Sequence, residues 1–221
     1  MRHLAPVVAC ILCCNLVALG ACAWGQPAAT RAEGKKAMAE VQDARGMLRI
    51  TEVRRTQDAL VVRYSLHGEG KAPVWVLDQL FRTSRAGYPH LEPERAYVEG
   101  RDGVLLLSRA LLAVPEDKEV EAPEVPCARR LSPGETLTGE IRVPLPPRED
   151  LPYAQPRSLD LAALRSVTLR IGYVEDVPEL RFREGKDDEG RACRSPSYGP
   201  AITRQRLAEV GPLPLPAQRT P

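Results

Sequence analysis

Short runs in which apolar residues occupy every second position limit the fold of this 221-residue chain more than any other feature. Residues 60–66 place Leu, Val, Tyr and Leu at alternate positions, and residues 167–173 do the same with Val, Leu, Ile and Tyr. A period of two is typical of a strand with one buried face. Breaks rich in Pro and Gly separate these runs, and few segments have a helical period. The sequence therefore predicts an all-β fold, an antiparallel β-sandwich of about seven strands.

Two of the breaks predict β-hairpins. Arg54–Asp58 lies between two alternating runs, and Asp102-Gly103 is a dipeptide that favours a two-residue hairpin turn. The run 73–81 is rich in β-branched and aromatic residues, so it predicts a largely buried strand with Trp75 as a core anchor.

One turn carries a family resemblance. Leu131–Glu135 (LSPGE) leads into a strand that ends in Val-Pro-Leu-Pro, and this combination resembles a feature of many extracellular Ig-like domains. The resemblance implies an Ig-like sandwich.

The first residues predict export from the cytoplasm. Arg2 and His3 precede an apolar run, and small residues close it. A positive start, an apolar middle and a small-residue end are typical of a signal peptide, which is removed from the mature protein. We therefore assign residues 1–21 to an export signal.

Three outcomes of that signal stay open. Leu19–Cys22 resembles the lipobox of bacterial lipoproteins, which implies cleavage before Cys22 and a lipid on that residue, and Ala23 then implies sorting to the outer membrane. Ala21–Ala23 also fits an A-x-A cleavage site, which would give a soluble chain that starts at Trp24. The segment Leu4–Trp24 is long enough to span a bilayer if it is not cut. We favour the lipoprotein.

The rest of the chain divides into a tether, a domain and a tail. Residues 22–46 are small and polar and predict a flexible tether, with a short docked helix as the alternative. Residues 47–210 carry the strand pattern and predict the domain. Residues 211–221 are Pro-rich and predict a disordered tail.

Charge excludes some partners. The chain has 31 basic and 29 acidic residues, and both signs are interspersed. Without a field of one sign, we expect no binding to nucleic acid. The membrane is expected as a partner through a lipid anchor at Cys22, and an envelope protein is a second candidate partner.

The mature domain contains two cysteines, Cys127 and Cys193. An oxidising compartment favours a disulfide between them, and two free thiols are the alternative. Such a bridge would contribute about 4 kcal/mol in the chain-entropy model.

No pattern of catalytic or metal-binding residues is apparent. His67 and His90 are the only histidines after the signal, and no nucleophile elbow or zinc motif surrounds a Ser or His. The acidic runs 116–124 and 187–189 lack the order of a calcium loop, and we interpret them as solvated loops. We therefore expect no cofactor, no metal and no enzymatic activity.

Two loops are candidates for binding. Gly87–Tyr97 offers Tyr88, His90 and Tyr97 as contact groups between prolines that limit the cost of ordering. Packing of both tyrosines on the edge of the domain is the alternative. Arg148–Pro156 (REDLPYAQP) is a second candidate for the same reasons.

These features favour a non-catalytic binding or structural module of the bacterial cell envelope. An outer-membrane lipoprotein that faces the periplasm is the favoured form, and a soluble periplasmic or secreted protein is the alternative. The competing hypothesis is an envelope hydrolase or carbohydrate-active enzyme with paired carboxylates, since such a pair needs no sequence motif.

Overall fold

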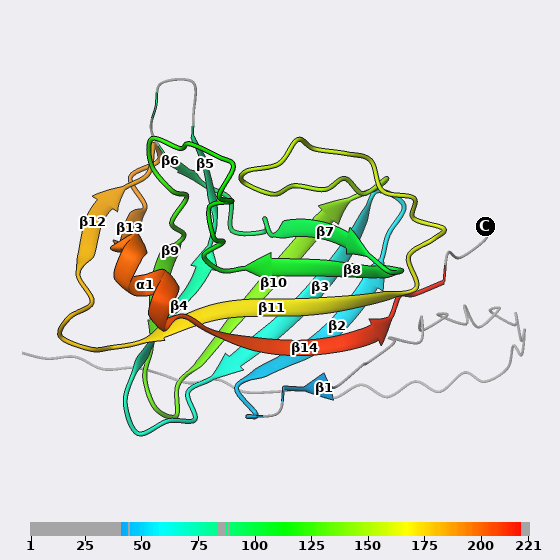
Figure 1. Ribbon diagram of the computed structural model, residues 1–221. Helices are drawn as coiled ribbons and strands as arrows, with labels where there is room; N and C mark the ends of the chain where they lie inside the picture. The colour runs from blue at the N-terminus through cyan, green and yellow to red at the C-terminus, as the bar shows by residue number, and fades with distance from the viewer. Residues whose placement is uncertain (1–40, 44, 84–86, 88, 218–221) are drawn as a thin grey trace, which may run out of the picture. The chain divides into compact units, whose positions relative to one another are not determined.

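Most of the described chain is β-structure (Figure 1). The computed structural model describes residues 41–43, 45–83, 87 and 89–217, which all lie within the unit Lys35–Pro221. Strands make up 51% of the structure and helix 4%, which confirms the all-β prediction. The predicted export signal, Cys22 and most of the predicted tether lie outside the described residues.

Two sheets contain most of the strands. The first is antiparallel and has the order β1–β2–β3–β10, with bounds Val41–Gln42, Leu48–Arg55, Ala59–His67 and Thr136–Pro144. The second has the order β7–β8–β11–β4–β9, and β14 also pairs with β11. Its strands are Tyr97–Arg101, Val104–Arg109, Ser166–Glu175, Val74–Gln79, Cys127–Leu131 and, for β14, Arg206–Pro214. The hairpins predicted at Arg54–Asp58 and Asp102-Gly103 are confirmed as β2–β3 and β7–β8.

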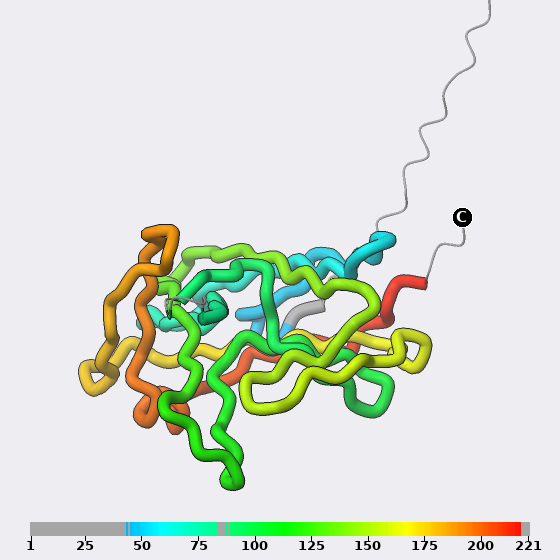
Figure 2. Tube along the Cα trace, turned by 90° about the horizontal axis from the view of Figure 1, so that it is seen from above, coloured from blue at the N-terminus to red at the C-terminus, as the bar shows by residue number. Residues whose placement is uncertain are grey.

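Three smaller elements complete the described structure. Two short hairpins consist of β5 (Phe81–Thr83) with β6 (Pro89–Leu91), and of β12 (Phe182–Lys186) with β13 (Ala192–Pro196). The helix α1 covers Tyr198–Arg204. None of the described residues form a helix that is long and apolar enough to cross a membrane. Figure 2 shows β12, β13 and α1 gathered at one end of the sheets.

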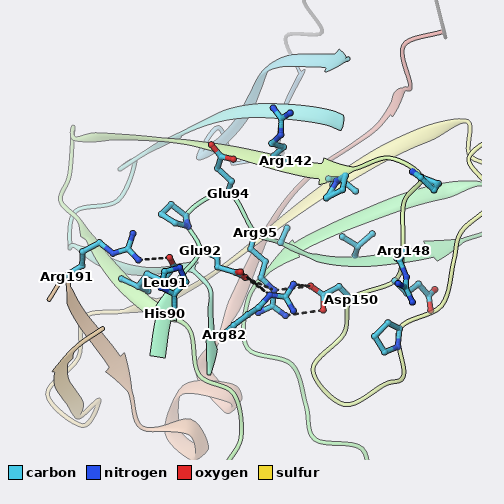
Figure 3. Close-up of a pocket in the computed structure, with 18 residues that line it drawn as sticks. Arg82, His90, Leu91, Glu92, Glu94, Arg95, Arg142, Arg148, Asp150 and Arg191 are labelled. Atoms are coloured by element: carbon cyan, nitrogen blue, oxygen red, sulfur yellow. Dashed lines mark hydrogen bonds and ion pairs between the residues drawn. The ribbon is translucent and has the colours of Figure 1, made fainter. Parts of the chain in front are cut away.

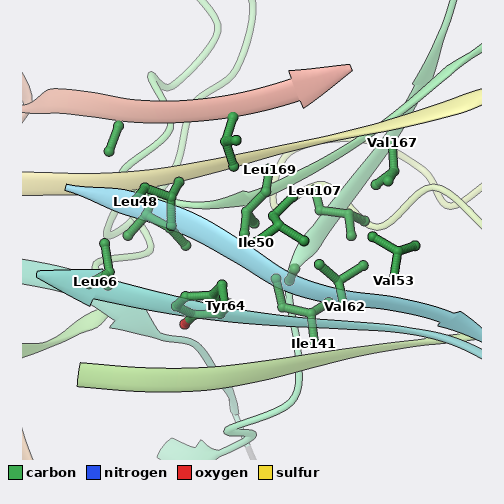
Figure 4. Packing of buried hydrophobic residues seen from close by; sticks show 14 of the residues in the cluster. Leu48, Ile50, Val53, Val62, Tyr64, Leu66, Leu107, Ile141, Val167 and Leu169 are labelled. Carbon is green, nitrogen blue, oxygen red and sulfur yellow. The ribbon is translucent and has the colours of Figure 1, made fainter. Parts of the chain in front are cut away.

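The two large sheets share one hydrophobic core. Successive side chains of a strand leave opposite faces of its sheet, so alternate residues of each strand reach this core. Figure 4 shows side chains of β2, β3 and β10 packing against those of β8 and β11. The largest apolar contributors, each at most 1% exposed, are Leu48, Ile50, Tyr64, Leu66, Leu105, Leu107, Leu131, Ile141 and Leu169. Burial of such a side chain stabilises the fold by about 1.5–3 kcal/mol.

The second sheet is mixed, which the sequence did not predict. β14 pairs antiparallel with β11 along nearly all of its length. On the opposite edge of β11, β8 pairs in parallel with Ser166–Ile171, and β4 pairs antiparallel with Tyr173–Glu175. A parallel pair needs a long connection. Here the connection from β8 to β11 includes β9 and β10.

The strands are more numerous than predicted, and two of them extend into the flanking segments. The described residues contain fourteen strands rather than about seven, because several short pairs add to the main sheets. β1 lies within residues 22–46, which are predicted as the tether, and β14 continues through Gly211–Pro214. Pro212 and Pro214 lack an N–H, which an edge strand such as β14 tolerates.

A second hydrophobic cluster lies beneath α1 and β12. Trp75, the predicted core anchor, belongs to this cluster, where its ring packs 4.5 Å from that of Phe182. The predicted disulfide is also present, since Cys127 in β9 and Cys193 in β13 are bonded with their Cα atoms 5.1 Å apart. The disulfide thus fixes the β12–β13 hairpin to the second sheet.

Candidate functional site

Two distant segments of the chain form the walls of one open pocket. The first wall is His90–Val98, which runs from β6 into β7, with Arg82 and Arg191 beside it. The second wall is Arg142–Asp150, which begins in the last residues of β10 and continues beyond it, together with Pro156. Val98 and Asp150 join the walls, because each donates its backbone N–H to the carbonyl of the other at 3.1 and 3.0 Å.

The pocket has the size of a small-molecule site, and its lining is divided between apolar and charged side chains. Its volume is about 760 Å³, within the range of about 300–1,000 Å³ that is usual for ligand pockets. Its apolar lining consists of Leu91, Pro93, Ala96, Val98, Val143, Pro144, Pro146 and Pro156. Charged side chains surround this apolar surface (Figure 3).

Four charged groups lock the two walls together. Asp150 receives hydrogen bonds from Arg95 Nε at 3.0 Å and from Arg82 Nη2 at 3.0 Å. Arg82 Nε also lies 2.8 Å from Glu92 Oε2, and Arg95 Nη1 donates to the carbonyl of Phe81 at 2.8 Å. Figure 3 shows Arg82, Arg95 and Asp150 side by side, with dashed lines marking their hydrogen bonds and ion pairs. The network positions the first wall against the second before any ligand binds.

The carboxylates of the second wall are held in their charged form. Burial opposes ionisation of Asp150, but hydrogen bonds from Arg95 and the charges of Arg95 and Arg82 keep its pKa below the ordinary value. A hydrogen bond from Arg157 lowers the pKa of Glu149 in the same way. Neither carboxyl is adapted to hold a proton at neutral pH.

A buried arginine fixes the backbone of the first wall. Arg109 is 2% exposed, and its guanidinium donates to the carbonyls of Arg95 at 2.8 Å, Pro93 at 2.5 Å and Glu140 at 2.8 Å. It also donates to the Tyr64 hydroxyl at 2.7 Å. Because Glu140 belongs to β10, Arg109 connects the first wall to the first sheet. Nothing in the sequence distinguishes this arginine from an exposed one.

The tip of the β12–β13 hairpin closes one side of the pocket. Arg191 donates to the carbonyl of Leu91 at 2.7 Å, and it pairs with Asp187 at 2.6 Å. Asp187 is 6% exposed and accepts the backbone N–H of Arg191 at 2.7 Å. The interpretation of residues 187–189 as a solvated loop is therefore wrong for Asp187, which holds the tip in place.

The three predicted contact residues have different positions. His90 lines the pocket and pairs with Asp188 at 2.9 Å, a hydrogen bond that raises the pKa of His90. Tyr97 is 2% exposed and donates to Glu124 at 2.9 Å, so its side chain packs inside the domain and does not line the pocket. Tyr88 lies outside the described residues. The second candidate loop, residues 148–156, supplies Arg148, Asp150 and other lining groups.

The other predicted candidates give no further site. His67 is exposed, contacts Thr136 at 3.1 Å and does not line the pocket. In the part of the chain that the structure describes, no group of His, Cys, Asp or Glu is arranged to hold a metal ion. The pocket between the two walls is therefore the candidate functional site.

Comparison of the chain with protein-family models, with curated proteins and with solved structures gives no match.

Proposed function

We propose that this protein is a non-catalytic binding module of the bacterial cell envelope. Its domain is an Ig-like β-sandwich, and its ligand occupies the pocket between His90–Val98 and Arg142–Asp150. The observation that carries the proposal is the preformed pocket itself. Two segments from different parts of the chain are joined there by a backbone bridge and by the ion pairs of Asp150.

Pre-organisation supports binding, because a ligand need not order the walls. The ordering of loops and side chains is a large cost of association, and it is already met here by bonds within the protein. The buried Arg109 and the docked Arg191 hold the first wall from two further sides.

The charge state of the carboxylates favours binding over hydrolysis. A glycosidase with paired carboxylates needs one carboxyl that keeps its proton, and this requires a raised pKa. Asp150 and Glu149 have lowered pKa values and are bound by arginines. The hydrolase is the second candidate, since Glu92 and Glu94 also line the pocket.

The N-terminal sequence supports a location in the envelope. The signal in residues 1–21 and the lipobox-like Leu19–Cys22 favour an outer-membrane lipoprotein anchored at Cys22 and facing the periplasm. In that place the domain could retain a periplasmic ligand or contact an envelope protein. Cleavage at the alternative site would give the same module in soluble form.

A pocket-blocking variant tests the proposed function. Pro156 is exposed and lines the pocket, so Pro156→Trp should fill the pocket without disturbing the core. Pro178 is equally exposed but lies outside the lining, and Pro178→Trp is the matched control. Each protein is immobilised, exposed to an envelope extract, washed and eluted, and the eluate is analysed by mass spectrometry.

We expect the eluates of the unaltered protein and of Pro178→Trp to share compounds that are absent from the eluate of Pro156→Trp. Equal retention by all three proteins would contradict the pocket as the binding site. Conversion of a glycan substrate that is lost in Glu92→Gln or Glu94→Gln would instead establish the hydrolase.

A further inference from the structure

The charges of the pocket are largely neutralised within the protein. Arg82 and Arg95 share Glu92 and Asp150, as described above. Glu149 is paired with Arg157, which lies outside the lining. These groups have their partners without a ligand.

Most of the remaining charged side chains at the rim are also partnered by described residues, with two exceptions. Arg142 pairs with Asp58 at 2.5 Å, Arg191 with Asp187, and His90 with Asp188. Asp58, Asp187 and Asp188 all lie outside the pocket lining. These three pairs therefore neutralise rim charges with carboxylates that do not line the pocket.

Arg148 and Glu94 are the exceptions. Both side chains are exposed and line the pocket, and neither has a hydrogen bond or ion pair with another described side chain. Arg148 belongs to the second wall and Glu94 to the first, and Figure 3 shows the two side chains apart from each other. Among the residues that the structure describes, the pocket thus offers one unpaired cation and one unpaired anion, from separate walls.

We propose that the pocket binds a short peptide segment that carries one acidic and one basic side chain, with the acidic group at Arg148 and the basic group at Glu94. This inference rests on the proposed function and names its ligand. A ligand with a single charge would pair with one wall and leave the other charge without a partner. A peptide satisfies both, because its two charged side chains can be separated by small apolar residues that cover Ala96, Val98 and Val143.

Capped peptides provide the test. The probes are acetylated and amidated, so that their ends carry no charge. The first series is Lys-(Ala)n-Glu with n from one to four, in both orders, because the required spacing is one of the quantities to be measured. Matched series replace Lys, Glu or both by Gln. Each probe is titrated into the ¹⁵N-labelled mature protein, and the amide signals of Ala96, Val98 and Val143 report the Kd.

At the best spacing, we expect the doubly charged peptide to bind about two- to fivefold more tightly than either singly charged peptide, the effect of one solvent-exposed ion pair. Arg148→Gln should reduce the affinity for the doubly charged peptide to that of the peptide without Glu. The affinity for the peptide without Glu should not change in this variant. Glu94→Gln should likewise reduce the affinity for the doubly charged peptide to that of the peptide without Lys, and should leave the affinity for the peptide without Lys unchanged. Arg183→Gln and Glu69→Gln change exposed charges outside the pocket lining and should have no effect.

Two results would overturn the inference. Equal binding of all four series would show that the pocket accepts peptides without reading these charges, and the proposed function would stand. If no peptide shifted the signals of the pocket amides, the proposed ligand class would be wrong. The proposed function would then be tested separately, by whether Pro156→Trp retains fewer compounds from the envelope extract than the unaltered protein does.

Discussion

Replacement of Arg109 should be among the most damaging single changes in this protein. Its guanidinium is 2% exposed and is the donor to the Tyr64 hydroxyl and to three backbone carbonyls. Arg109→Met keeps the length and apolar stem of the side chain but removes all of these donors. A buried acceptor without its donor costs about 1–3 kcal/mol. With partial hydration of the carbonyls at the pocket, we expect a loss of about 3 kcal/mol in the free energy of unfolding.

The hydroxyl of Tyr64 provides an internal check on this reasoning. It accepts from Arg109 and donates to Asp78 at 3.2 Å, and Asp78 is also bound by Arg129. Tyr64→Phe therefore removes one bridge but leaves Asp78 paired, and it should cost about 1–2 kcal/mol. The double variant Arg109→Met/Tyr64→Phe should lose less than the sum of the two, because both changes remove the same bond.

Urea unfolding of the oxidised mature protein, followed by circular dichroism, measures these free energies. Arg183→Gln is the control, and as a surface change it should shift stability by no more than about 0.5 kcal/mol. If Arg109→Met unfolded like this control, the buried guanidinium would not be holding the first wall of the pocket. Full additivity in the double variant would likewise contradict the bridge through Tyr64.

Two further predictions concern the hairpin beside the pocket. The hydrogen bond to Asp188 raises the pKa of His90, so an NMR titration should place its midpoint above 6.5, and Asp188→Asn should lower it. Because the pKa of His90 is raised in the folded state, the contribution of this pair to stability is complete below pH 6.5 and is lost as the pH rises through the folded-state pKa. A titration midpoint of His90 at or below 6.5 would contradict the ion pair. Removal of the disulfide by Cys127→Ser/Cys193→Ser opens a loop with a sequence separation of 66 residues, and should reduce the free energy of unfolding by about 4 kcal/mol in urea. Unchanged stability would show that the disulfide does not restrict the unfolded chain.

Local patterns in the sequence predicted the elements of the fold better than their arrangement. The alternation in 60–66 and 167–173 and the Asp102-Gly103 turn depend on neighbouring residues, and each is found where it was predicted. The parallel pairing of β8 with β11 depends on contacts between strands that are far apart in the chain. Such pairing has no local signal.

The candidate site shows the same division. The two loops chosen for their composition, 87–97 and 148–156, both contribute to the pocket, yet nothing in the sequence indicated that they meet. Tyr97 was chosen as a contact residue because it is aromatic and polar, but the same properties suit a buried ring with a bonded hydroxyl. The ion pairs of Asp150 could not be predicted either, because charged residues are common throughout the chain.

The intact mass of the native protein tests most directly the central claim of an exported, anchored binding module. It should be measured without reduction in membrane and soluble fractions. The account predicts a membrane-bound chain that begins at Cys22, carries added acyl mass and contains the disulfide between Cys127 and Cys193. A soluble chain that begins at Trp24, or a chain that keeps residues 1–21, would contradict the lipid anchor.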